Sequence, residues 1–120
     1  MNKDLDGIQV VTLEQAVAAP YASGKLAQAG ARVIKVEREE GDFARKYDND
    51  VKGLSAYFVW LNHGKESVCL NIKDTNDLKI LKNIISKSDI FIQNLMPGAT
   101  ERLGIGSSKL RSMYLSLIHI

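Results

Sequence analysis

The chain has few of the residues that stabilise proteins covalently or bind metals. Its 120 residues include one cysteine, two prolines and two histidines. The single cysteine, Cys69, cannot form an internal disulfide, which agrees with a reducing compartment. Cys69 lies inside a strand-like run and no motif links it to either histidine, so we expect a small packing residue rather than a nucleophile.

Long apolar runs and a strong charge imbalance are missing as well. No apolar run approaches the roughly 18 residues of a membrane span, and residues 1–6 lack the charged-then-apolar order of a signal peptide. Sixteen basic and 14 acidic residues give a formal net charge of +2, which does not call for a nucleic-acid partner. We therefore expect a cytoplasmic protein that binds neither membrane nor nucleic acid.

Two apolar runs separated by an alanine-rich segment organise the chain. Residues 8–13 and 33–37 are short and β-branched, which is typical of buried strands. Between them, residues 20–29 predict a helix, with Pro20 at its first position and Gly30 as its stop. Strand, helix and strand form a βαβ unit, which implies a parallel sheet. Ligands of such sheets bind at the carboxyl ends of the strands, here residues 14–20 and 37–45.

The remaining sequence continues the α/β pattern. Further strands are expected at 67–72, 90–93 and from 115 to 120, and helices at 75–87, 99–103 and 107–113. Thr75 and either Ser107 or Ser108 are the expected N-caps of the two longer helices. No repeat or linker divides the chain, so we expect one α/β domain, a largely parallel sheet with flanking helices, that ends inside a strand.

The long stretch between the second and third strands has two parts. Residues 39–52 are charged and lack apolar periodicity, which predicts a loop leaving the carboxyl edge of the sheet. Ser55 is the expected cap of a short helix whose aromatic residues we interpret as core or subunit contact rather than a ligand platform.

Several catalytic and nucleotide-binding motifs are absent. The turn at residues 14–19 contains no glycine, which disfavours a dinucleotide fold of the usual kind, and no Walker-type loop occurs. There is no His/Cys spacing for a metal and no Gly-x-Ser-x-Gly motif. Composition and spacing alone therefore predict an α/β domain with a ligand-binding edge and no metal.

A set of short motifs goes further. They are Leu5-Asp6-Gly7-Ile8, Ala18-Ala19-Pro20, Gly30-Ala31-Arg32-Val33-Ile34-Lys35-Val36-Glu37, Gly41-Asp42, Leu61-Asn62-His63-Gly64-Lys65-Glu66-Ser67, Gln93-Asn94-Leu95-Met96-Pro97-Gly98 and Arg102-Leu103-Gly104. In this order and spacing they resemble the amino-terminal part of the family III CoA-transferases, the CaiB/BaiF type, which includes formyl-CoA transferase and α-methylacyl-CoA racemase. Members are longer Rossmann-like chains that interlock as homodimers. The resemblance implies that residues 1–120 are an incomplete amino-terminal part of the family's large domain.

The resemblance also implies a chemistry. Similar enzymes move coenzyme A from an acyl-CoA thioester to a carboxylic acid, through an aspartate that attacks the thioester. The matching aspartate would lie beyond Ile120, and neither Asp42 nor Asp48 matches it, so we assign no catalytic residue and expect the fragment to be inactive alone. Two alternatives remain open: a racemase-like isomerase of the same fold, and a non-enzymatic nucleotide-binding domain. The reading frame past Ile120 would distinguish them.

The residues that the resemblance assigns to coenzyme A lie near the expected strand ends. They are Ala16, Val17, Ala18, Arg38, Leu70, Lys73, Asn94, Leu95 and Arg102. The small residues of the first turn would let the cofactor approach the backbone, and the arginines and the lysine would contact its phosphates. Gln15, Val17 and Ala19 depart from the pattern of the formyl-CoA enzyme, which bears on the acyl group.

Two further expectations concern behaviour. Arg38 directly follows a strand, whereas Arg45 is expected in a loop that is free to move, so Arg38 should contribute more to coenzyme A binding. The incomplete last strand would expose apolar groups and unpaired amides, so the isolated 120-residue chain should be aggregation-prone or partly molten.

Overall fold

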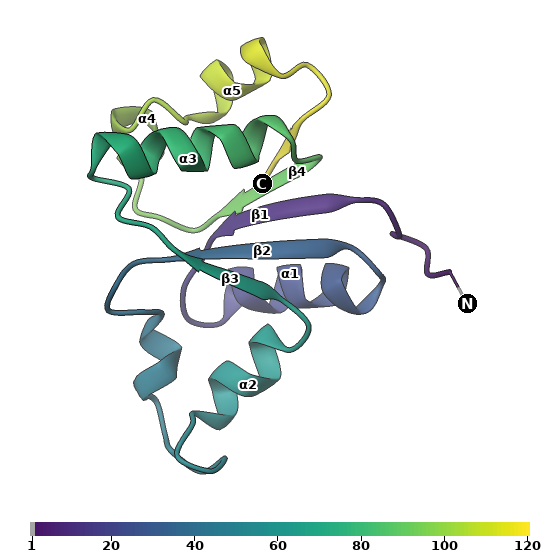
Figure 1. The fold of residues 1–120 in the computed structure, drawn as a ribbon, viewed down its shortest axis with the longest axis vertical. Helices are drawn as coiled ribbons and strands as arrows, with labels where there is room; N and C mark the ends of the chain where they lie inside the picture. The colour runs from purple at the N-terminus through teal and green to yellow at the C-terminus, as the bar shows by residue number, and fades with distance from the viewer. Residues whose placement is uncertain (1) are drawn as a thin grey trace.

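A five-stranded sheet forms the centre of the chain, in the computed structural model that describes residues 2–120 (Figure 1). The strand order is β3-β2-β1-β4-β5, and every neighbouring pair is parallel. The strands are β1 Gln9–Leu13, β2 Arg32–Glu37, β3 Glu66–Cys69, β4 Ile90–Gln93 and β5 Ile118–His119. The predicted parallel α/β fold is confirmed. The carboxyl ends of β1, β2 and β3 meet at one edge, at the left in Figure 1.

Helices cover both faces of this sheet (Figure 1). One face carries α1 Ala18–Gln28 and α2 Ala56–Asn62, and the other carries α3 Thr75–Ser86, α4 Ala99–Arg102 and α5 Ser107–Met113. A short 3-10 helix, η1 Phe43–Lys46, follows β2 at the carboxyl edge. Within residues 2–120, no helix is both long enough and apolar enough to cross a bilayer.

Alternate residues of each strand pack on opposite faces of the sheet. The side that faces α3 and α5 holds the larger apolar cluster, which includes Val11, Leu13, Val36, Leu81, Ile85, Phe91 and Leu110. The α1 side holds a smaller cluster of Val10, Ala19, Ala31, Val33 and Ile92. Because burying one such aliphatic or aromatic side chain contributes about 1.5–3 kcal/mol, the α3 side dominates the apolar stabilisation.

Helices α1 and α2 approach each other closely at a glycine. A Cβ placed on Gly24 would lie 2.9 Å from the carbonyl oxygen of Leu61, a distance shorter than ordinary van der Waals contact. The neighbouring Ser23 is fully buried. Small residues on α1 therefore allow the backbone of α2 to lie directly against it.

The ends of several elements differ from the sequence prediction. Asp74, not Thr75, is the N-cap of α3, where its carboxylate accepts a hydrogen bond from the Asp77 N–H at 3.0 Å. Helix α5 begins at Ser107 with Gly106 as its N-cap, so neither predicted serine cap is correct. Helix α1 begins two residues before Pro20, and β3 ends at Cys69 rather than residue 72. A carboxylate competes well for a helix N-terminus, which explains the first difference.

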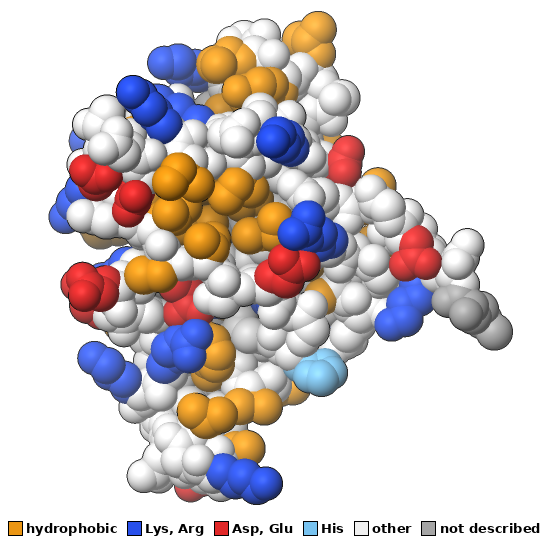
Figure 2. Space-filling view, in the orientation of Figure 1, with side chains coloured by type: hydrophobic (Ala, Val, Ile, Leu, Met, Phe, Trp, Pro, Cys, Tyr) orange, Lys and Arg blue, Asp and Glu red, His pale blue; other side chains and the backbone are white. Residues whose placement is uncertain are grey.

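The structure contradicts the packing prediction for Cys69 and the core alternative for the aromatic residues of α2. Cys69 is exposed on the edge strand β3. On α2, Leu61 is buried, whereas the side chains of Tyr57 and Trp60 are half exposed, so these aromatics are not core (Figure 2, where apolar side chains show over α2 in the lower part of the view). Their interpretation as a subunit contact stays a prediction.

Candidate functional site

A cavity of about 270 Å³ opens at the carboxyl edge of the sheet, between the ends of β1, β2 and β3. Its lining residues are Leu13, Glu14, Gln15, Val36, Glu37, Arg38, Glu40, Gly41, Asp42, Leu70, Asn71, Ile72, Lys73 and Leu95. Four of the nine sequence-predicted residues are in this lining: Arg38, Leu70, Lys73 and Leu95. The cavity thus combines an aliphatic wall with charged groups, and Figure 2 shows side chains of both charges gathered at the left, on this edge.

The two cations of the cavity are weakly paired. The Arg38 guanidinium lies 4.4 Å from the centre of the Phe43 ring, and its Nε is 3.8 Å from a Glu40 carboxylate oxygen. Its side chain is 45% exposed. Lys73 has no carboxylate within ion-pair distance among residues 2–120. Both groups are therefore available to an anionic ligand.

Beneath this cavity, on the α1 side of the sheet, four charged residues form a buried charge cluster: Glu14, Lys35, Asp42 and Lys65. The Lys35 ammonium lies 2.7 Å from Asp42 Oδ2 and 3.5 Å from Glu14 Oε1, and the Lys65 ammonium lies 2.7 Å from the same Glu14 oxygen. Ser23 Oγ donates to the other Glu14 oxygen at 2.6 Å. Two positive and two negative groups balance, as buried ions require.

Lys65 is tied to this cluster through three acceptors. Besides Glu14, its ammonium donates to the Pro20 carbonyl at 2.9 Å and to Asn62 Oδ1 at 3.0 Å. Burial lowers the pKa of Lys65, and the Glu14 carboxylate opposes that change. All three ammonium protons are used, so this lysine connects β3 to the first turn rather than to a ligand.

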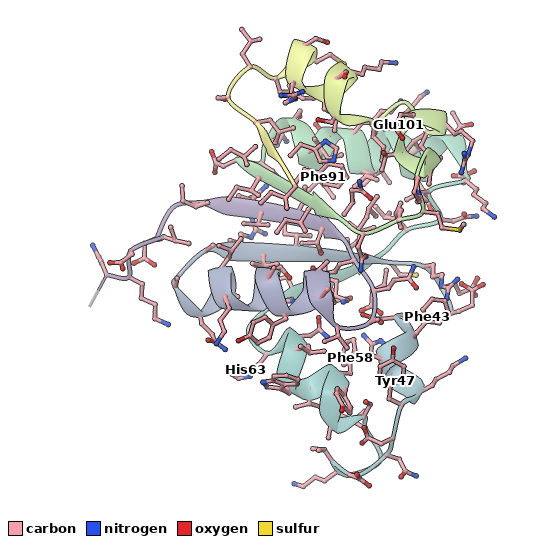
Figure 3. The ribbon with its side chains drawn as sticks, turned by 180° about the vertical axis from the view of Figure 1, so that it is seen from behind. Phe43, Tyr47, Phe58, His63, Phe91 and Glu101 are labelled. Atoms are coloured by element: carbon pink, nitrogen blue, oxygen red, sulfur yellow. The ribbon has the colours of Figure 1, made fainter. Side chains whose placement is uncertain are left out.

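A second ion pair flanks the cluster. Arg45 donates from Nε and a terminal nitrogen to the two Glu37 oxygens, at 2.8 and 2.7 Å. Burial would raise the pKa of Glu37, but hydrogen bonds from Arg45 and the Asp42 N–H outweigh it and lower the value to about 2. The Phe58 ring covers the Arg45 guanidinium at 3.8 Å, beside Phe43 and Tyr47 at the edge shown in Figure 3. The expectation that Arg45 is free to move is therefore wrong.

The first turn, residues 14–17, is fixed from two sides. Ala16 has a backbone φ of +65°, a region that non-glycine residues seldom adopt. Its N–H donates to Asp42 Oδ1 at 2.8 Å. The Asn94 carboxamide binds the Gln15 backbone twice, accepting from its N–H at 3.0 Å and donating to its carbonyl at 2.9 Å. Asn94 thus holds the turn from the end of β4.

The other sequence-predicted residues lie around the cavity rather than in it. Ala16 and Asn94 adjoin it through Gln15, and Val17 and Ala18 lie at the start of α1, where both are exposed. The Arg102 guanidinium lies over Gly98: a Cβ placed on Gly98 would be 2.9 Å from a guanidinium nitrogen of Arg102. Arg102 is not among the residues that line the cavity.

The buried charge cluster was not predicted from the sequence. One signal was present: Lys35 lies between Ile34 and Val36 in an otherwise apolar strand, and two residues after Val33, which packs toward α1. The period of two places the lysine on that same covered face, where a cation needs partners. Those partners are Asp42, in the loop after β2, and Glu14, directly after β1, and no local pattern specifies them.

The arrangement suits binding more than proton transfer. Asp42 and Glu14 are buried, and each accepts hydrogen bonds within the protein, so neither is presented to a reacting group. In contrast, Arg38 and Lys73 offer donors beside an aliphatic wall of Leu13, Val36, Leu70 and Leu95. Gln15 Oε1 is buried without a partner among residues 2–120, and it belongs to a cavity-lining side chain. This lining suits an anionic ligand that also has an apolar part.

The parallel sheet and its edge cavity define an α/β protein of the class whose ligands bind at the carboxyl ends of the strands. The chain belongs to CoA-transferase family III, whose profile matches residues 5–120. This confirms the family predicted from the motifs.

Two curated relatives and one solved structure illustrate the similarity. The chain is 37% identical over 106 residues to human succinyl-CoA:glutarate CoA-transferase, covering 87% of this chain and 24% of the relative. It is 36% identical over 115 residues to acetyl-CoA:oxalate CoA-transferase of Acetobacter aceti, covering 95% and 30%. The crystal structure of a CaiB/BaiF family protein from Brucella suis superposes with a TM-score of 0.92 at 31% identity, covering 99% of this chain and 33% of that one. The chain therefore spans about a quarter to a third of these relatives.

Proposed function

We propose that residues 1–120 are the amino-terminal, coenzyme A-binding part of a CoA-transferase that moves coenzyme A between an acyl-CoA thioester and a carboxylic acid. The observation that carries the proposal is the edge cavity, in which Arg38 and Lys73 lack strong carboxylate partners beside an aliphatic wall. The family membership supplies the chemical class. The relatives are named for different acyl groups and acids, so the substrate pair of this protein is left to experiment.

The proposed binding residues divide by chemistry. Arg38 contacts a phosphate of the nucleotide end, and Lys73 and Arg102 add positive charge near the same anion. Leu70 and Leu95 line the arm of the cofactor, and the turn residues Ala16, Val17 and Ala18 let it pass close to the backbone. Gln15 Oε1 accepts an N–H from the amides of the cofactor's arm, because it is a buried acceptor with no protein partner.

We place the catalytic carboxylate in the part of the proposed full-length protein that follows Ile120. As a nucleophile it would attack the thioester carbon, form a mixed anhydride and expel the coenzyme A thiolate. The thiolate would then attack the carbonyl of the catalytic carboxylate, which releases the donor acid and leaves coenzyme A on the enzyme, and the acceptor acid would take coenzyme A by the same two steps in reverse. We propose that the complete protein works as a cytoplasmic homodimer and that the 120-residue fragment is inactive alone.

Two measurements test the proposal. Extending the reading frame past Ile120 should reveal an aspartate downstream of the Pro97–Gly98 turn, in a protein several times longer than this chain. Calorimetry on that full-length protein should detect coenzyme A binding, and acyl-CoA with oxalate, glutarate or succinate should yield an exchanged thioester. A full-length protein that binds no coenzyme A would refute the proposal.

A further inference from the structure

Asp42 makes four polar contacts that join three separate segments. Its Oδ1 accepts from the N–H of Ala16 at 2.8 Å and from the N–H of Ala44 at 2.9 Å. Its Oδ2 accepts from the Lys35 ammonium at 2.7 Å, and its own N–H donates to Glu37 at 3.0 Å. The first turn, strand β2 and helix η1 therefore meet at one carboxylate whose side chain is fully buried.

The contact to Ala16 crosses the cavity wall. Glu14 and Gln15 line one side of the cavity, and Gly41 and Asp42 line the adjoining side. The positive φ of Ala16 is disfavoured for an alanine and persists only where the surroundings impose it. The Asp42 hydrogen bond is one of those constraints, and the Asn94 clamp on Gln15 is the other.

We propose that Asp42 is a positioning residue that acts through Ala16, fixing the first turn against the loop after β2 so that the cavity keeps the width that coenzyme A needs. This inference rests on the proposed function, because it concerns the same cavity. Asp42 does not contact the ligand itself, since both of its oxygens are occupied by protein donors. Lys35 orients the carboxylate by holding Oδ2, which leaves Oδ1 directed at the turn.

The inference predicts a specific pattern of ligand affinity. If Asp42 acted only as a buried charge partner of Lys35, removing both charges together would restore binding whatever residue replaced the aspartate. If it positions the turn, binding also requires an oxygen atom at the place of Oδ1. An asparagine can supply that oxygen and an alanine cannot.

The test compares two double variants in the full-length protein, Asp42→Asn with Lys35→Met and Asp42→Ala with Lys35→Met. Both double variants remove the two charges of the Lys35–Asp42 pair together. They differ only in whether position 42 carries a carboxamide. We expect the asparagine variant to bind coenzyme A within about threefold of the wild-type Kd, and the alanine variant to bind about tenfold more weakly or worse. Amide exchange measured by NMR should be faster for Ala16 in the alanine variant only.

Asp48→Ala is the matched control. Asp48 lies in the same loop and its carboxylate also accepts backbone N–H groups, from Asp50 at 3.1 Å and Ala56 at 2.7 Å, but it is not in the cavity lining. Its loss should leave the coenzyme A affinity unchanged. Equal affinities in the two double variants would overturn the positioning role while leaving the proposed function intact.

A single variant covers the case in which the double variants fail to fold. Asp42→Glu keeps the negative charge opposite Lys35 but moves the acceptor oxygens outward by one methylene. It should weaken coenzyme A binding about tenfold in a protein with unchanged far-UV circular dichroism. Wild-type affinity in this variant would overturn the inference. A wild-type protein that binds no coenzyme A would refute the proposed function and the inference with it.

Discussion

Lys35 and Arg38 are two cations three residues apart at the end of β2, and their surroundings are opposite. The Lys35 side chain is 1% exposed and held by two carboxylates, whereas the Arg38 side chain is 45% exposed and touches Glu40 only at 3.8 Å. Arg45 is intermediate between them: its side chain is partly exposed, but its Nε and one terminal nitrogen both donate to Glu37. All three lie at or just after the end of β2, but only Arg38 lines the cavity. Their availability to a ligand depends on how far carboxylates of the protein already occupy them.

Lys35→Met should have the largest effect and tests the buried side of this comparison. The substitution leaves the Asp42 carboxylate and part of Glu14 buried with a lost partner, which typically costs about 3–5 kcal/mol of unfolding free energy. Urea denaturation of the full-length protein measures it. Arg38→Met is the matched control, with the same residue type introduced three positions later at an exposed site. Equal stability of the two variants would contradict the distinction between buried and available cations.

Arg38→Ala tests the ligand side of the comparison and should have the next largest effect. A charge-assisted contact to a phosphate is worth about 1.5–3 kcal/mol, so the coenzyme A Kd should rise about ten- to a hundredfold. Calorimetry with coenzyme A and with its form lacking the 3′-phosphate separates two roles. A phosphate contact predicts a larger loss for coenzyme A, whereas stacking on adenine predicts similar losses for both.

Arg45→Ala is the control for that experiment. Because Arg45 is engaged with Glu37, its loss should lower stability and change the coenzyme A affinity little. Equal, small affinity changes in both arginine variants would place the cofactor away from this strand end.

The pair of Glu37 and Arg45 gives a smaller, pH-dependent effect. The pKa of Glu37 falls from its ordinary 4.5 to about 2 in the folded protein, so its contribution is complete above 4.5 and disappears as the pH falls toward 2. Because the Arg45 side chain is 41% exposed, water screens the pair and we expect about 1–2 kcal/mol rather than the full value of the shift. Glu37→Gln should lower stability at neutral pH and flatten its fall between pH 4.5 and 2. An unchanged slope of stability against pH would contradict this assignment.

The exposed ion pair of Arg32 and Glu66 should have the smallest effect. Its two contacts, at 2.9 and 3.0 Å, are nearly as short as those of Arg45 and Glu37, but both side chains are more than half exposed. Arg32→Ala should therefore change thermal stability little, and added salt should remove the remaining difference. A loss as large as that of Glu37→Gln would show that contact geometry matters more than burial.

Most of the fold could be predicted from local patterns in the sequence. The β4 strand Ile90–Gln93 was predicted with its observed bounds, and β1, β2 and α3 within a few residues, because alternating or three- and four-residue apolar spacing is a local property. The wrongly predicted helix and strand ends are those that depend on a competing neighbouring side chain or on a contact with a distant segment. Asp74 takes the place of Thr75 as the N-cap, and β3 ends early because its partner β2 ends at Glu37, which pairs with Cys69.

The candidate site was predictable only in part, for a related reason. The βαβ pattern located the edge, and the family resemblance named four residues that line the cavity. The role of Asp42 could not be read from its neighbours, since its partners Ala16 and Lys35 lie 26 and 7 residues away. A hydrogen-bond hub of this kind depends on how three segments meet, which only the folded arrangement specifies.

The close approach of Gly24 to the carbonyl of Leu61 means that the residue at position 24 of α1 affects the buried ion pair of Lys65 and Glu14. Lys65 follows α2 by a few residues, and its ammonium reaches Glu14 at 2.7 Å only because α2 lies directly against α1. A methyl group at position 24 would push α2 away from α1 and move Lys65 away from the Glu14 carboxylate. The distance between α1 and α2 thus determines whether Lys65 can reach Glu14. A larger residue at position 24 would require a side chain of different length or charge at position 65.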